Sequence, residues 1–343
     1  RPALAQHAAA AGATVPLWSG SIVSGGKTYK YQMVGKNPLV HESSPSVTIG
    51  APIIPVDFSF SSGNGGGNFN PAKASCGEAL SDSNLVKQSP IFTNLTYTDG
   101  GTKLGTGEYT DIFQRANFWK YVGGSAKTNP GYGVNLAGTV EPAFKVTVAS
   151  SAGGVEGTGC GALGLIDQID WDSFVQKTLI PDLSSEINPT KIPVFIFRNV
   201  AMYLDHNVSD CCALGYHSGF TKSSGTPQFY TVTDIDDSGN FSGVEDVSDL
   251  AHEVGEWLDD PSGINPTPKW GHVGQDPNSC QANLEVGDPL TDTNLAITAS
   301  NGIIYHPQEL TFFSWFYRQK PSIGVNGYYS LADTFTAPSK PCS

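Results

Sequence analysis

The run His252-Glu253-Val254-Gly255-Glu256 places an imidazole and two carboxylates where they could bind a metal ion. Residues four positions apart lie on the same face of a helix, one turn from each other, so His252 and Glu256 are spaced to share one ion. Glu253 between them is then placed to take a proton from a metal-bound water. The segment reads HExxE and differs from the zinc-binding pattern HExxH only in its last residue.

These residues need a helix to bring them together, and the sequence predicts one from about Gly243 to Leu258. Apolar residues recur at the i, i+3, i+4 spacing of a buried stripe: Val247, Leu250, Ala251, Val254 and Leu258. Before the stripe, Ser242-x-x-Glu245 fits a capping box, in which each side chain accepts a hydrogen bond from the other residue's backbone. We therefore expect the helix to begin at this box.

The opposite face of the predicted helix carries one histidine and several acids: Asp249, His252, Glu253, Glu256 and Asp260. It contains no Lys or Arg, and like charges one turn apart repel each other. Asp259 and Asp260 also lie at the C-terminus of the helix, where the helix dipole disfavours anions. A bound cation is the simplest explanation for this acid-rich face.

Four segments then carry a resemblance to a known family: HEVGEWLDDP (252–261), NLEVGDP (283–289), CCALGYHS (211–218) and YHPQELTFFSWFYR (305–318). They resemble secreted bacterial proteins with a zincin-like fold that carry HEVxEWxDDP followed by NxEVGDP. The resemblance covers roughly the C-terminal half of the chain. It implies a metallopeptidase-like site, with Glu253 as general base, His252 and Glu256 as metal ligands, and a protein or peptide as substrate.

The third metal ligand is open at this point. In zincins of the glutamate-ligand type, a Glu on a second downstream helix completes the site, often with an Asp a few residues later, and Glu285 and Asp288 match that pattern loosely. Asp260, one turn beyond Glu256 on the first helix, is the alternative. The expected cofactor is a divalent metal, zinc first. Because Glu in place of His makes the site harder and more anionic, calcium, manganese or iron are alternatives.

The segment DIDDSGNFSGVE (234–245), just before the predicted helix, matches the twelve-residue calcium-loop pattern. Its ligand positions are Asp234, Asp236, Ser238, Asn240 and Glu245. The preceding element reads as a strand rather than the helix of such motifs, and Glu245 is already used by the capping box. An acidic turn without calcium is therefore the alternative.

The fold class that the whole sequence predicts is α+β. Strands are expected over 17–23, 27–34, 53–60, 143–148, 193–200 and 228–233, helices over 110–121, 171–178 and 307–318, and a hairpin over 295–305. We expect residues 1–50 to form a β-rich N-terminal segment. Residues 51–343 should form a zincin-like metal-binding domain, a mixed β-sheet with an active-site helix.

Charge excludes two classes of partner. The chain has 32 Asp and Glu against 19 Lys and Arg, a net charge of −13, so it offers no surface that neutralises phosphates. Nucleic acids and anionic membranes are therefore not expected partners. No run of about 18 apolar residues is present either, so membrane insertion is not expected.

The six cysteines are expected to form disulfide bonds: Cys76, Cys160, Cys211, Cys212, Cys280 and Cys342. They lack the CxxC spacing of zinc sites, and disulfides indicate a secreted, extracellular location. The start at Arg1 rather than Met fits the removal of a targeting segment. A bond between the neighbours Cys211 and Cys212 would be strained, so we expect each of them to pair with a distant cysteine.

Two functions follow as hypotheses. The first is a secreted metallopeptidase-like hydrolase, in which the metal polarises a peptide carbonyl and Glu253 deprotonates the attacking water. The second is a non-catalytic extracellular protein, a filament or surface layer assembled from copies of this chain, that uses metal and disulfides for rigidity. Three further histidines near the motif segments, His217, His272 and His306, are candidates for a ligand or an oxyanion donor.

Overall fold

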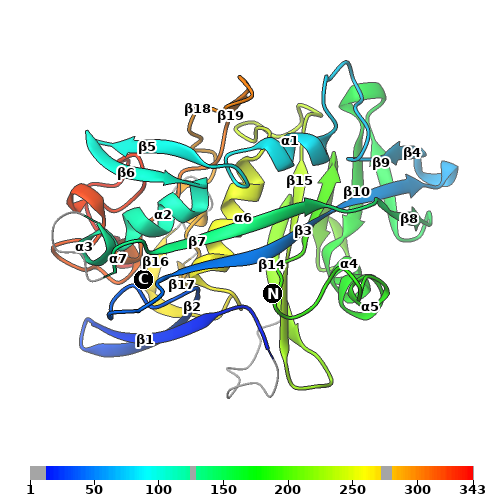
Figure 1. Ribbon diagram of the computed structural model, residues 1–343. Coiled ribbons are helices and arrows are strands. Elements are labelled where there is room, and N and C mark those ends of the chain that lie inside the picture. Colours follow the sequence, from blue (N-terminus) through cyan, green and yellow to red (C-terminus); the bar gives the residue numbers. More distant parts are fainter. Residues whose placement is uncertain (1–12, 124–128, 272–279, 343) are drawn as a thin grey trace.

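The computed structural model describes residues 13–123, 129–271 and 280–342, and in these ranges the fold is mixed α+β and rich in strands (Figure 1). The largest described sheet has seven strands: β3 (Ser46–Phe60), β4 (Gly67–Phe69), β7 (Gly133–Val140), β8 (Phe144–Val148), β11 (Val194–Arg198), β14 (Gly215–Thr221) and β15 (Pro227–Ile235). Their order is β14-β15-β11-β3-β4, and β7 and β8 pair with successive halves of β3. The pairs among β15, β11, β3, β7 and β8 are parallel, whereas β14 and β4 are antiparallel to their neighbours.

The central strands of this sheet are buried on both faces. All five residues of β11 and all nine of β15 are buried. Parallel strands covered on both sides read as continuous apolar runs, and the strands predicted over 193–200 and 228–233 are found close to those bounds. β3 begins at Ser46, earlier than the predicted start at 53, because its first half pairs with β7, which is distant in sequence.

The other described strands form a second sheet and four two-stranded sheets. The second sheet has the order β13-β12-β10-β9, with β9 (Gly153–Glu156), β10 (Leu163–Asp167), β12 (Val200–Leu204) and β13 (Asn207–Ala213). The two-stranded sheets are β1 (Leu17–Ser24) with β2 (Lys27–Val34), β5 (Leu95–Asp99) with β6 (Thr102–Gly107), β16 (Pro266–Gly271) with β17 (Cys280–Asn283), and β18 (Ile297–Thr298) with β19 (Ile304–Tyr305). The strands predicted over 17–23 and 27–34 and the hairpin predicted over 295–305 are confirmed.

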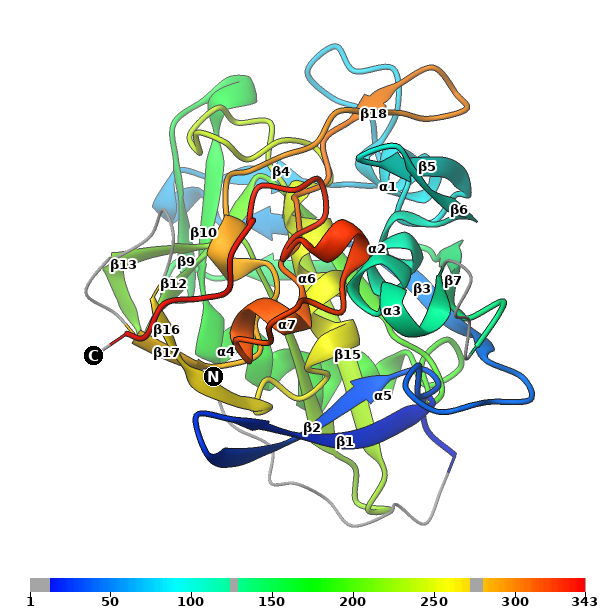
Figure 2. The same cartoon turned by 90° about the vertical axis from the view of Figure 1, so that its left-hand side faces the viewer.

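Helix α6 (Ser248–Asp259) runs through the interior of the molecule (Figure 2). It contacts β14, β15, β2 and α2, and eleven of its twelve residues are buried. The other helices are α1 (Asp82–Gln88), α2 (Tyr109–Asn117), α3 (Trp119–Val122), α4 (Gln168–Phe174), α5 (Ile180–Asp182) and α7 (Phe313–Phe316). None of the helices in the described ranges is both long and apolar enough to cross a membrane. The acid-rich face of α6 therefore lies inside the protein, as does its apolar stripe.

The predicted start of the motif helix is wrong. The helix begins at Ser248 rather than Gly243, and the capping box of Ser242 with Glu245 does not form. Gly243 has φ +82°, a left-handed conformation that no helix contains. Instead, Ser248 Oγ accepts a hydrogen bond from the backbone N–H of Glu245 at 3.1 Å. The residues before α6 therefore form a loop, whose path the helical periodicity did not show.

The helix predicted over 307–318 is also mostly wrong, since only α7, Phe313–Phe316, is helical. Before it the backbone is extended and bonds to distant segments: the N–H of Glu309 donates to Thr293 O at 2.8 Å, and that of Thr311 donates to Val286 O at 2.8 Å. These bonds replace the hydrogen bonds of a helix. Tertiary pairing therefore overrides local propensity here.

The N-terminal β-rich segment predicted for residues 1–50 is described from residue 13 onward. Its hairpin of β1 and β2 packs into the same apolar core as α6, in which Trp18 and Met33 join Val254 and Trp257. Strand β3 runs across residue 50 without interruption. The hairpin thus helps to cover the buried helix.

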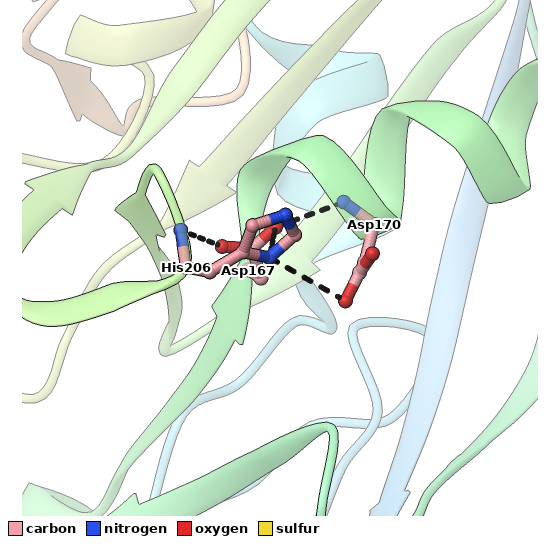
Figure 3. A group of neighbouring side chains, drawn as sticks. All are labelled: Asp167, Asp170 and His206. Atoms are coloured by element: carbon pink, nitrogen blue, oxygen red, sulfur yellow. Dashed lines mark hydrogen bonds and ion pairs between the residues drawn. The ribbon is translucent and has the colours of Figure 1, made fainter.

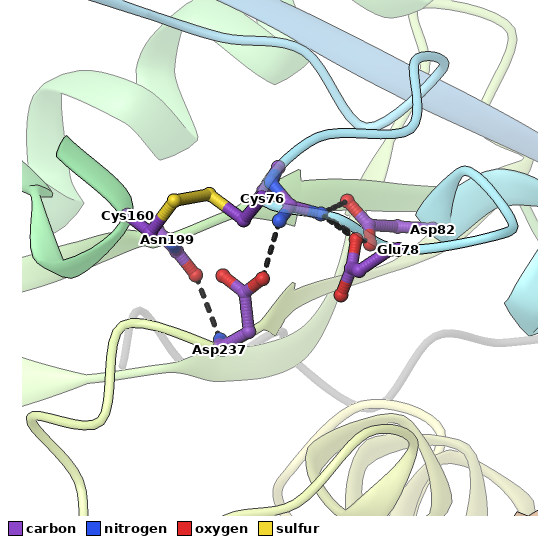
Figure 4. The surroundings of a disulfide bond; sticks show 7 residues. Cys76, Glu78, Asp82, Cys160, Asn199 and Asp237 are labelled. Atoms are coloured by element: carbon purple, nitrogen blue, oxygen red, sulfur yellow. Dashed lines mark hydrogen bonds and ion pairs between the residues drawn. A yellow bond between two sulfur atoms is a disulfide. The ribbon is translucent and has the colours of Figure 1, made fainter.

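The disulfide bonds join Cys76 to Cys160, Cys280 to Cys342, and Cys211 to Cys212. Figure 4 shows the first of them. The prediction of distant partners for Cys211 and Cys212 is wrong. The other four cysteines pair among themselves across long stretches of sequence, so the two neighbours bond to each other.

Replacing both Cys76 and Cys160 by Ser should lower the free energy of unfolding by about 2–5 kcal/mol, because the bond joins residues 84 positions apart and restricts the unfolded chain. Replacing Cys211 and Cys212 together is the matched control, since their bond closes no long loop. We expect the control to change the free energy of unfolding by less than about 1 kcal/mol. Urea denaturation measures both values, and equal losses in the two variants would contradict this account.

Candidate metal centre

Helix α6 carries His252, Glu253 and Glu256 into the interior, where all three residues are buried. The helix lies directly against the start of β14, and this contact depends on Gly215. A Cβ atom on Gly215 would lie 2.4 Å from Asp249 Oδ2 and 2.9 Å from Glu253 Cγ, closer than atoms pack. The missing side chain therefore allows the polar face of α6 to meet the strand.

One set of residues that could hold a metal ion, the His252 group, consists of His252, Glu256 and Asp288. His252 Nε2 lies 3.1 Å from Glu256 Oε1 and 3.5 Å from Asp288 Oδ1. Asp288 belongs to the NLEVGDP segment, which the fold brings beside α6. One nitrogen and two carboxylate oxygens thus converge at one point, a donor set that binds divalent metals.

Gln308 orients the ring of His252. Its amide Nε2 donates to Gly287 O at 2.7 Å, so its Oε1 faces His252 Nδ1 at 3.1 Å and accepts a hydrogen bond from it. With the proton on Nδ1, the lone pair of the neutral ring is on Nε2, which faces the two carboxylates. An acceptor on the far nitrogen is the usual support of a metal-binding histidine. Sequence reasoning missed Gln308, although it lies in the segment 305–318 that carries part of the resemblance.

A second set, the His217 group, consists of His217, Glu253 and Glu256. His217 Nδ1 lies 3.2 Å from Glu253 Oε2 and 3.4 Å from Glu256 Oε2. Its Nε2 donates to the backbone carbonyl of Asp260 at 2.9 Å. His217 is on β14, and its side chain is fully buried. From the sequence, His217 was one of three equal candidate histidines, because residue spacing does not show that β14 lies against α6.

The charges of the two groups perturb one another. Burial and, to a smaller extent, the charge of Glu253 raise the pKa of Asp249 to about 7. For His252, burial lowers the pKa, but the charges of Glu256, Glu253 and Asp288 outweigh this effect, and the pKa lies well above its ordinary value. The shift of His252 indicates an excess of negative charge at the polar face of α6.

A pocket with a volume of about 500 Å³ opens onto this face. His252, Glu253, Asp288 and Gln308 line the pocket together with the segments 212–215 and 240–244. A small molecule or a peptide side chain that enters the pocket therefore reaches the His252 group and Glu253 together.

Two of the predicted third ligands do not join either group. Both side-chain oxygens of Asp260 accept hydrogen bonds in the turn after α6, from the N–H groups of Ile264 at 3.0 Å and Asn265 at 2.8 Å. Glu285 Oε1 accepts from Asn283 Nδ2 at 2.5 Å. Among the three candidates, Asp288 is the one that the described structure brings to His252 and Glu256.

The residues of the predicted calcium loop have other contacts. Asp234 lies near the end of β15, and its Oδ1 accepts from the N–H of Val200 at 3.0 Å. Asp236 Oδ1 accepts from Ser238 Oγ, which in turn accepts from Asn240 Nδ2. Glu245 pairs with His306 at 3.0 Å. None of the five belongs to the metal-capable groups of the described residues, and these contacts fit the acidic-turn alternative.

The remaining candidate histidine, His272, lies outside the described residues. A further group that could hold a metal is on the surface, where Asp167 contacts Asp170 and His206 (Figure 3). Asp167 Oδ1 accepts from the N–H of Asp170 at 2.9 Å and lies 3.1 Å from His206 Nδ1. The side chains of Asp170 and His206 are 68% and 58% exposed, unlike those of the two groups on α6.

A scan against models of known protein families, a search of curated proteins and a search of solved structures find no match to this chain. Functional inference therefore depends on the geometry of the site.

Gly287 gives a test of the His252 group. A Cβ atom on it would lie 2.5 Å from Cγ of His252, so Gly287→Ala should displace the ring and weaken zinc binding about 10- to 100-fold. Gly161→Ala is the control, because a Cβ there meets its first atom at 3.6 Å. Competition with a zinc-binding dye measures both affinities. Unchanged zinc affinity in Gly287→Ala would show that His252 does not bind the metal.

Proposed function

We propose that this protein is a secreted metal-dependent hydrolase of the metallopeptidase type, built on a zincin-like scaffold. The observation that carries the proposal is the position of Glu253 beside three metal-binding residues at the wall of a pocket. Its Oε1 lies 4.0 Å from His252 Nε2, and both residues line the pocket. The disulfide bonds support a secreted location.

Three residues would hold the metal: His252 through Nε2, Glu256 through Oε1 and Asp288 through Oδ1. Catalytic zinc sites commonly have three protein ligands drawn from His and carboxylates, so zinc is the proposed metal. Two carboxylates make the donor set harder than an all-histidine set, which makes manganese or calcium the alternatives. When bound, the metal would polarise the peptide carbonyl and lower the pKa of a water ligand.

Glu253 would act as the general base. Its Oε2 lies 3.2 Å from His217 Nδ1, so a proton or a metal ion between these two atoms would hold the carboxylate in place. Its Oε1 faces His252 and is the oxygen that would take the proton of the attacking water and pass it to the leaving nitrogen. A positioned base of this kind is effective because the proton acceptor does not have to be recruited from solvent.

An extended peptide is the proposed substrate. β14 is an edge strand of the seven-stranded sheet, and its first residue, Gly215, lines the pocket. An edge strand has backbone N–H and C=O groups that can pair with an added strand. A peptide bound in this way would lie beside α6, with a side chain in the pocket of about 500 Å³.

Replacing Glu253 by Gln should lower kcat on an unfolded protein substrate by about 10²- to 10⁴-fold, because an amide cannot accept the proton. Metal analysis of the same sample should still find the ion held by the His252 group. Glu245→Gln is the matched control, since Glu245 lies in the loop before α6 with a half-exposed side chain. Full activity of Glu253→Gln with metal bound would exclude Glu253 as the base.

A further inference from the structure

Glu256 faces two different histidines with its two carboxylate oxygens. Oε1 lies 3.1 Å from His252 Nε2, and Oε2 lies 3.4 Å from His217 Nδ1. The His252 group and the His217 group share Glu256 and no other residue. In paired-metal sites the two ions lie about 3.5–4 Å apart. A single carboxylate with one oxygen on each ion spans such a distance.

Both histidines are oriented as metal ligands are. His217 donates from Nε2 to Asp260 O, and His252 donates from Nδ1 to Gln308 Oε1. Because these oxygens only accept hydrogen bonds, the other nitrogen of each neutral ring carries a lone pair. In both residues that nitrogen faces carboxylate oxygens, an arrangement that is repulsive unless a cation lies between them.

Charge balance favours two cations over one. Three carboxylates belong to the two groups: Glu253, Glu256 and Asp288. Glu253 and Glu256 each face both His217 and His252. Buried charges need compensation, and one divalent cation balances only two of the three carboxylates.

We propose that the His217 group binds a second divalent cation through His217 Nδ1, Glu253 Oε2 and Glu256 Oε2, so that the site is dinuclear. Glu253 would then bind this ion through one oxygen and keep the other toward His252. The inference rests on the proposed function, because the first ion shares Glu256 with the second.

The competing occupant of the His217 group is a proton. A doubly protonated His217 would donate from Nδ1 to Glu253 and Glu256, and would act as a positioning residue for a single metal. The number of metal ions bound per chain separates the two cases, because a protonated His217 contributes no metal site.

The test is a titration of chelator-treated protein with Mn²⁺, followed by elemental analysis of the bound metal and by electron paramagnetic resonance. The wild-type chain should bind two equivalents and give the spectrum of an exchange-coupled pair. His217→Gln, which keeps a hydrogen-bonding side chain, should bind one equivalent and lose the coupling. One equivalent in both proteins would overturn the second site and leave the proposed function standing.

The surface group of Asp167, Asp170 and His206 provides the control, because it could also bind Mn²⁺. His206→Gln should still bind two equivalents with a coupled spectrum. If this variant loses one equivalent and His217→Gln does not, the second ion is on the surface and the dinuclear site is wrong. A wild-type chain that binds no metal would overturn the proposed function itself.

Discussion

The structure depends on the burial of a helix with an acid-rich face. Eleven of the twelve residues of α6 are buried, among them two glutamates and an aspartate, and α6 has no basic residue other than His252. Transfer of carboxylates from water to a protein interior is costly unless they are neutralised or paired. The elements around α6 reduce this cost: β14 contributes His217, which faces Glu253 and Glu256, and α2 contributes Gln114 and Asn117, which donate to Asp259.

A second set of acids, of which Asp82 is buried, shows a different solution to the same problem. Near the Cys76–Cys160 bond, Glu78, Asp82 and Asp237 surround Arg198, whose Nη1 lies 2.8 Å from Glu78 Oε2 and from Asp82 Oδ1 (Figure 4). A guanidinium with several donors can serve several carboxylates at once. At the polar face of α6, imidazoles rather than a guanidinium face the carboxylates. Imidazoles are metal ligands as well as bases, so the choice of cationic partner distinguishes a structural cluster from a candidate site.

The close packing around α6 requires residues without side chains. Gly215 lets β14 approach Asp249 and Glu253, and Gly287 makes room for the ring of His252. Gly255, on the helix itself, makes room for Leu310, because a Cβ at residue 255 would lie 2.5 Å from a methyl group of Leu310. Each of these glycines has an ordinary backbone conformation, so the space beside it, rather than its φ angle, explains the residue type. They allow the side chains of the His252 and His217 groups to lie within a few ångströms of each other.

Local spacing was sufficient to predict the motif helix and the pairing of His252 with Glu256, because both depend on one turn of helix. It also predicted the central strands β11 and β15, whose residues are buried on both faces. Local spacing could not choose Asp288 over Asp260 and Glu285, or find Gln308, because that choice depends on how the chain after residue 280 folds back on α6. For the same reason, local spacing could not predict where α6 begins or that Cys211 pairs with Cys212. The backbone of Gly243 and the partners of the other cysteines are settled by contacts between segments far apart in sequence, and only the folded chain makes those contacts.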